Sequence, residues 1–196
     1  WSKLIESKIT AFPQKNLSTS KKITIGYVSD DFYPHAIASL IKGLFNSHDK
    51  NKFNINNYSY RKDDGNEYMR QFRKDASLFR DISIISDFEA AQAINSDKVD
   101  ILVDLKGYSG KSRMEIFAFR PSPIQITWLG FPGTTGANFM DYILTDKIVT
   151  PKSYQKYFSE KFLYLSDSYQ INDSHKEIAK GNFGKRLFGL DQNSFI

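Results

Sequence analysis

The sequence predicts an α/β protein with a Rossmann-like parallel sheet and helices on both faces. Short apolar runs alternate with helical patterns along residues 22–170, which is typical of repeated βαβ units. The run DILVDL at 100–105 is almost continuously apolar, as expected for a strand that is covered on both faces. With 196 residues, 40% of them hydrophobic and 25% charged, the chain is large enough to bury one such core.

The elements follow from local patterns. Residues 1–12 carry apolar side chains at helical spacing, which predicts a helix that Pro13 ends, followed by a polar linker at 14–21. Strands are expected at 23–28, 53–60, near 81–85, and at 100–105, 124–130, 141–146 and 161–165. Helices are expected at 36–45, 66–79 and 88–94, and Ser86 or Asp87 would cap the last of these.

Composition narrows the classes of function. The chain has no cysteine, and its three histidines (His35, His48 and His175) lie far apart, so neither a disulfide framework nor a zinc cluster is expected. The net charge of +5 fits an anionic ligand or simply solvated lysines, and the lysines are too scattered to indicate a nucleic-acid face. No apolar run approaches the ~20 residues of a membrane span, and no signal peptide is visible. We therefore expect a cytoplasmic protein without membrane or nucleic-acid partners.

Ligands of open α/β sheets bind beyond the carboxyl ends of the strands, so the segments that follow the strands are the candidate sites. The segment SDDFYPH (29–35) places His35 and two carboxylates before a helix. A histidine there can exchange protons near neutral pH. The alternative is that Asp30 or Asp31 caps the helix and that His35 is structural.

Two glycine-containing segments follow later strands. KGYSGK (106–111) combines backbone freedom with positive charge, but it lacks the spacing of a phosphate-binding P-loop. GFPGTTG (130–136) offers N–H groups and hydroxyls that can hold phosphate or sugar oxygens. Either segment could also be an ordinary loop. Asp104, near the end of an apolar strand, is expected to orient the loop that follows it.

Two long stretches resemble a known family. KITIGYVSDDFYPHAIASL (22–40) and ILVDLKGYSGKSRMEIFAFRPSPIQITWLGFPGTTGANFMDYILTD (101–146) are similar to the catalytic region of O-GlcNAc transferase and SPINDLY-type enzymes, glycosyltransferase family 41. The resemblance runs continuously over about residues 22–170. His35 falls on the histidine of the family's GYVS-D-F-x-x-H pattern. Ser39 stands where the family often has a second histidine.

The resemblance implies a GT-B architecture, in which tetratricopeptide helices precede two Rossmann-like lobes that enclose a nucleotide sugar. Residues 1–21 would then end the helical region, 22–170 would form the N-terminal lobe, and 171–196 would lead toward a C-terminal nucleotide-binding lobe that carries the family's lysine. His35 is the candidate catalytic residue. The candidate cleft residues are Asp30, Gly107, Tyr108, Pro132, Gly133, Thr134, Thr135 and Gly136.

The function that the resemblance implies is inverting transfer of a sugar to serine or threonine hydroxyls of a polypeptide. The expected donor is UDP-GlcNAc, which supplies N-acetylglucosamine. The expected partners are the polypeptide acceptor, the C-terminal lobe and the preceding helices, and no metal or other cofactor is expected. The isolated lobe should be inactive. Two alternatives stay open: transfer of fucose from GDP-fucose, and a non-catalytic α/β binding module.

Overall fold

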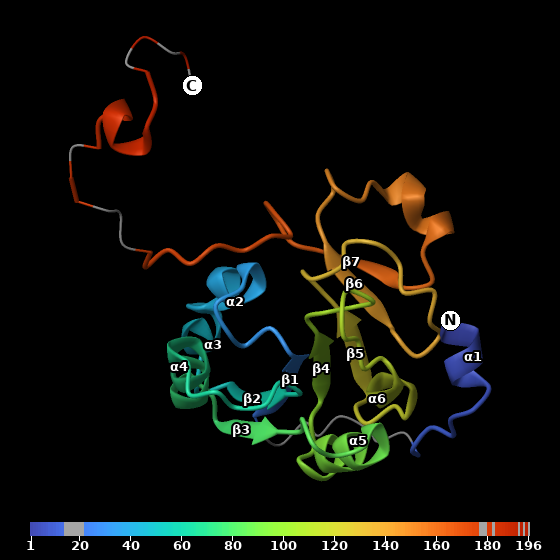
Figure 1. Ribbon diagram of the computed structural model, residues 1–196. Coiled ribbons are helices and arrows are strands. Elements are labelled where there is room, and N and C mark those ends of the chain that lie inside the picture. The colour runs from blue at the N-terminus through green and yellow to red at the C-terminus, as the bar shows by residue number, and fades with distance from the viewer. Residues whose placement is uncertain (14–21, 177–179, 182, 192, 194, 196) are drawn as a thin grey trace.

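The computed structural model describes residues 1–13, 22–176, 180–181, 183–191, 193 and 195. Within these residues the centre is a seven-stranded sheet in the order β3-β2-β1-β4-β5-β6-β7 (Figure 1). Every neighbouring pair is parallel. The strands are β1 (Ile23–Ser29), β2 (Phe53–Ser59), β3 (Leu78–Asp81), β4 (Ile101–Asp104), β5 (Ile124–Thr127), β6 (Tyr142–Thr145) and β7 (Lys161–Tyr164). The predicted fold class is confirmed.

Helices cover both faces of the sheet. They are α1 (Ser2–Glu6), α2 (Ala36–Ile41), α3 (Leu44–Ser47), α4 (Glu67–Asp75), α5 (Asp87–Ser96), α6 (Glu115–Ala118) and the 3-10 helices η1 (Lys152–Tyr157) and η2 (Lys185–Phe188). One apolar core packs α1, α5 and α6 against the sheet, and it includes Ile94, Leu102 and Phe117. The other core packs α2, α3 and α4, and it includes Phe32, Phe45 and Phe72.

The strand order reverses between β1 and β4. The chain moves outward from β1 to β2 and β3, then returns to place β4 on the other side of β1. Loops that leave the carboxyl ends of β1 and β4 therefore diverge to opposite sides and leave a crevice between them, which is where doubly wound proteins bind ligands. This arrangement selects the loops after β1 and β4 as the centre of a site.

The predicted N-terminal helix is too long. It ends at Glu6, whereas Ile9 and Phe12 pack along the core and the N–H of Phe12 donates to the carbonyl of Phe119 at 2.7 Å. The extended chain, rather than one helical face, places these two side chains against the core, where they are partly buried. The predicted linker at 14–21 lies outside the described residues.

Two other helix predictions also fail at their ends. The helix expected at 36–45 divides at Lys42–Gly43 into α2 and α3. The helix expected at 66–79 ends at Asp75, because residues 78–81 pair with β2 as strand β3, earlier than the strand predicted near 81–85. Ser86 caps α5 as predicted, in a reciprocal capping box with Glu89. The short elements α6, η1 and η2 were not predicted.

Candidate functional site

A buried lysine joins the two loops at the strand-order reversal. Lys106 follows β4, and its Nζ donates to Oδ1 of Asp31 at 2.8 Å and lies 2.7 Å from Oδ1 of Asp30, both of which follow β1. Lys106 and Asp31 are buried, and Asp30 is largely so. The positive charge that the sequence analysis offered to a ligand is therefore already paired within the chain. The cluster of Lys106, Asp30 and Asp31 has two carboxylates for one ammonium group and is acidic as a whole.

The pKa values of this cluster shift for opposing reasons. Burial raises the pKa of Asp31 above its usual range, although Lys106 opposes the shift. Burial alone would lower the pKa of Lys106, but the two carboxylates outweigh burial and the pKa is raised. Lys106 therefore stays cationic at neutral pH and fixes the position of both carboxylates.

His35 caps α2, whereas the structural alternative considered from sequence assigned this cap to Asp30 or Asp31. The N–H of Ile37 donates to Nδ1 of His35 at 3.3 Å, while Oδ1 of Asp31 lies 3.5 Å from the same nitrogen. When Nδ1 accepts, the neutral ring carries its proton on Nε2, which then donates. When Nδ1 is protonated, it faces Asp31 and Nε2 is free to accept a proton. The cap and the carboxylate therefore favour opposite tautomers.

Asp104 orients the loop after β4, as predicted. Its carboxylate accepts from the N–H of Lys106 at 2.9 Å and from the N–H of Gly107 at 2.8 Å. Burial raises the pKa of Asp104 to about 6, even though these N–H groups favour the charged form. The Asp104 carboxylate therefore fixes the backbone at Lys106 and Gly107 by accepting from both of their N–H groups.

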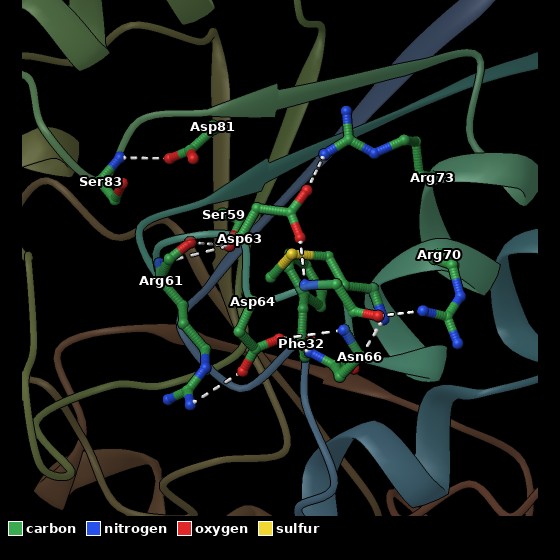
Figure 2. Close-up of polar contacts among 12 residues, drawn as sticks. Phe32, Ser59, Arg61, Asp63, Asp64, Asn66, Arg70, Arg73, Asp81 and Ser83 are labelled. Carbon is green, nitrogen blue, oxygen red and sulfur yellow. Dashed lines mark hydrogen bonds and ion pairs between the residues drawn. The ribbon is translucent and has the colours of Figure 1, made fainter.

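The loop after β2 forms the third wall, which the sequence analysis did not identify. Arg61 pairs with Asp64 at 3.3 Å and Arg73 pairs with Asp63 at 2.7 Å, and the amide of Asn66 donates to the carbonyl of Phe32 at 3.4 Å (Figure 2). The guanidinium of Arg61 also lies 4.0 Å from the ring centre of Tyr33, which stacks on His35 at 5.3 Å. These contacts join the β2 loop to the β1 loop.

A pocket of about 700 Å³ opens between these three loops. Asp30, Tyr33 and Lys106 lie in its wall, together with residues 60–64 and 110–111. His35 is not among the residues that line this pocket, but its ring stacks on Tyr33, which does line it. A second pocket of about 540 Å³ lies between α2, α3, α4 and residues 173–176, and it contains none of the predicted site residues.

The loop after β5 packs against the loop after β4. A Cβ on Gly130 would lie 2.2 Å from the carbonyl oxygen of Leu105, and a Cβ on Gly107, which has φ +60°, would lie 2.6 Å from Cβ of Phe131. Glycine is therefore required at both positions for the loops to approach. The structure thus brings all three predicted loop segments to one edge of the sheet.

Glu160 anchors the far end of the β5 loop and was missed from sequence. This buried carboxylate accepts from the N–H of Thr135 and the hydroxyl of Thr134, each at 2.7 Å, and from the hydroxyl of Thr135. The two threonine hydroxyls are thus already engaged within the protein. The ligand role predicted for Pro132, Gly133, Thr134, Thr135 and Gly136 stays a prediction, with the backbone and the exposed Pro132 and Gly136 as the available groups.

Tyr108 faces α1 rather than the pocket. Its hydroxyl lies 2.5 Å from Oγ of Ser2, which in turn donates to the carbonyl of Thr135 at 2.6 Å. Burial raises the pKa of Tyr108. The predicted cleft residue Tyr108 is thus part of a polar joint between α1 and the loops after β4 and β5.

The three histidines do not meet. His48 pairs with the hydroxyl of Tyr27 at 2.9 Å, and His175 is an exposed neighbour of Asp173. Among the described residues, no group of three or more histidine, aspartate or glutamate side chains could hold a metal ion. No helix in the same part of the chain is long and apolar enough to cross a bilayer.

Known proteins resemble this chain over most of its length. The sequence profile of glycosyl transferase family 41 matches residues 2–187. The chain is 36% identical over 189 residues to the Arabidopsis thaliana protein named probable UDP-N-acetylglucosamine–peptide N-acetylglucosaminyltransferase SEC. The alignment covers 94% of this chain and 19% of that protein. It is 36% identical over 159 residues to the Caenorhabditis elegans UDP-N-acetylglucosamine–peptide N-acetylglucosaminyltransferase, covering 81% of this chain and 14% of that one.

A solved structure agrees with these relatives. A mutant (K341M) of the Thermobaculum terrenum O-GlcNAc transferase superposes with a TM-score of 0.76 at 28% identity, over 83% of this chain and 31% of that protein. The chain therefore spans less than a third of each of these relatives, and the likeness is to one portion of their structure.

Proposed function

The chain belongs to glycosyl transferase family 41, and from this premise we propose that the protein that contains it transfers N-acetylglucosamine from UDP-GlcNAc to serine or threonine hydroxyls of polypeptides. The chain would supply the N-terminal lobe of a GT-B enzyme. The observation that carries this proposal is the continuous family match over 2–187, which includes every loop at the carboxyl edge of the sheet. The names of the relatives support both the donor and the peptide acceptor.

The proposed reaction is an inverting displacement. The acceptor oxygen forms a bond to the anomeric carbon while the bond from that carbon to the diphosphate oxygen breaks, and the hydroxyl proton leaves to a base. The diphosphate departs with the electron pair and needs positive charge or N–H groups around it. We assign these groups to the C-terminal lobe, because Lys106 in this lobe is already paired with two carboxylates. No metal is part of this proposal.

We assign His35 a hydrogen-bonding role toward the substrates. Its Nδ1 accepts from the α2 backbone, so the neutral ring presents an Nε2–H donor. Such a donor can orient a sugar or acceptor oxygen, which contributes through positioning rather than proton removal. Asp31 supports the opposite tautomer, in which Nε2 would act as a general base. The pH profile separates these two roles.

The test uses the full-length protein with UDP-GlcNAc and a serine-containing peptide. We expect His35→Ala to lower kcat/KM by about a hundredfold, whereas His175→Ala, at an exposed histidine, should leave it unchanged. If His35 donates, His35→Asn should retain part of the rate without a new pH dependence. If it acts as base, the rate of the wild type should fall toward acidic pH, where the base is protonated, and this limb should be absent from the variant.

The same assay separates the remaining donors. Transfer from GDP-fucose and not from UDP-GlcNAc would replace the proposed donor but retain the family. Near wild-type transfer by His35→Ala would remove His35 from the site. If neither donor is bound or consumed by the full-length protein, the enzymatic proposal is wrong and a binding module is favoured.

A further inference from the structure

The edge of the sheet at β6 and β7 carries a segment that is rich in exposed lysines. Residues 147–163 contain four lysines (Lys147, Lys152, Lys156 and Lys161) and one acid, Glu160. All four lysines are exposed, and none has an ion-pair partner among the residues that the structure describes. We call the solvent-facing side of residues 147–163 the basic edge.

Burial removes the nearby acids from this surface. Glu160 is fully buried, and its carboxylate is bonded to the β5 loop. Asp146, immediately before the segment, is also buried and accepts from the N–H groups of Ile148 and Val149 at 2.8 Å. The part-exposed Asp141, beside Lys161, is paired with Arg120 at 3.0 Å. The sequence therefore understates the charge of the basic edge, because these carboxylates are buried or paired while the lysines are exposed.

Apolar side chains are interleaved with these lysines. Ile148 is 85% exposed and Tyr157 is 64% exposed. In a 3-10 helix residues three apart share a face, and the rings of Tyr154 and Tyr157 in η1 lie 6.2 Å apart. In β7, Lys161 and Leu163 both face solvent. Figure 1 shows η1 standing out from the body of the molecule beside β6 and β7.

We propose that the basic edge docks the protein onto a membrane surface with anionic headgroups. Lysines attract such a surface and can extend their ammonium groups to it along apolar stems. Tyrosines favour the interfacial region, and exposed aliphatic side chains bury apolar area among the upper acyl chains. A nucleic acid would use the lysines and the two tyrosines, so the choice rests on the exposed aliphatic side chains of Ile148 and Leu163, which bury more apolar area among acyl chains. The contact would be peripheral, with no segment crossing the bilayer, and it would replace the expectation from sequence that the protein has no membrane partner.

The proposal is tested with full-length protein and sedimented vesicles of phosphatidylcholine and phosphatidylserine in a two-to-one ratio. A lysine near an anionic surface strengthens binding by about fivefold. We therefore expect the K147Q/K152Q/K156Q/K161Q variant to lose at least about tenfold in vesicle affinity at low salt, and Ile148→Ser to lose several-fold. Pure phosphatidylcholine vesicles should bind weakly.

A matched control removes the same charge elsewhere. Lys22, Lys50, Lys52 and Lys74 are exposed and belong to the β1, β2 and α4 end of the sheet, so their joint change to glutamine should preserve most vesicle binding. Equal losses in the two quadruple variants, or no vesicle binding by the wild type, would overturn the proposal. Binding to single-stranded RNA that depends on the basic edge, without vesicle binding, would also overturn it and assign the surface to nucleic acid.

Discussion

Buried carboxylates do the positioning at the carboxyl edge of the sheet. Asp104 holds the N–H groups of Lys106 and Gly107, while Asp30 and Asp31 hold the ammonium group of Lys106. An ion pair that is taken out of water contributes little net stability, but removing one partner leaves a buried charge and is strongly destabilising. The cluster therefore fixes one arrangement of the β1 and β4 loops more than it adds to the total free energy of folding.

Asp104 should give stability a recognisable pH dependence. The pKa of Asp104 is raised from its ordinary 3.8 to about 6 in the folded protein, so the folded state binds the proton more tightly. This contribution to stability is present below pH 3.8 and is lost as the pH rises through 6. The wild type should therefore lose this contribution between pH 4 and 7, whereas Asp104→Asn has no such group to titrate. The free energy of unfolding of the variant, taken relative to that of the wild type, should rise over this range by on the order of 2 to 3 kcal/mol.

Urea denaturation across that pH range measures the difference. The absolute stability of Asp104→Asn also includes the lost N–H contacts, but that offset does not vary with pH. Parallel pH profiles for the two proteins would show that Asp104 is not the titrating group.

At the scale of elements, one side chain ties the loop after β5 to the start of β7, two strands away in the sheet. Glu160 precedes β7 and receives three donors from Thr134 and Thr135 in the β5 loop. Oγ1 of Thr134 already accepts from the N–H groups of Gly136 and Ser159 at 3.0 and 3.2 Å. With both lone pairs used, this hydroxyl must donate, so its partner has to be an acceptor.

This requirement predicts an order of stability at position 160. Glu160→Ala leaves buried donors without a partner and should lower the free energy of unfolding by on the order of 2 to 4 kcal/mol. Glu160→Gln keeps one acceptor oxygen but turns an N–H toward Thr134, so it should lower the free energy by about 1 to 2 kcal/mol. Thermal and urea unfolding of both variants give the order, and a glutamine variant no better than the alanine variant would contradict this account.

At the scale of the whole molecule, the segment after β7 returns across the carboxyl ends of the strands toward α2 (Figure 1). Nε1 of Trp128 donates to the carbonyl of Tyr169 at 2.8 Å, and the N–H of Tyr169 donates to Asp146 at 2.8 Å. Tyr169 and Ile171 pack against the core beneath. A Cβ on Gly43 would lie 2.8 Å from Oδ1 of Asp173, so this segment also approaches the break between α2 and α3.

Trp128 should control the attachment of this segment. Trp128→Phe removes the indole donor and leaves the Tyr169 carbonyl without it, at a cost of about 1 to 3 kcal/mol. We expect faster amide hydrogen exchange in residues 166–176 with little change in β1 and β4. Trp1→Phe, the same change at an exposed residue, should alter neither quantity. Unchanged exchange in the segment would assign its attachment to the packing of Tyr169 and Ile171.

The sequence alone determined the fold class and most strand positions. It also narrowed the cap of α5 to Ser86 or Asp87 and pointed to the loops after β1, β4 and β5, but not to the loop after β2. These features depend on neighbours a few residues apart, such as side-chain periodicity and capping, so a linear pattern contains them. Helix ends at Glu6 and Asp75 were not determined, because packing of Ile9 and Phe12 and the pairing of β3 with β2 replaced the local preference.

Only the tertiary structure decided how the site residues are used. Lys106 lies 75 residues from Asp31, and Glu160 lies 25 residues from Thr135, so no local pattern reports that these groups neutralise or bind one another. Long-range contacts of the same kind place the Tyr108 hydroxyl against Ser2 and bury Glu160 beneath the surface that carries the lysines. The sequence gives the chemical type of each side chain. Its burial and its hydrogen-bond or ion-pair partners are set only when the sheet brings the ends of distant strands to one edge.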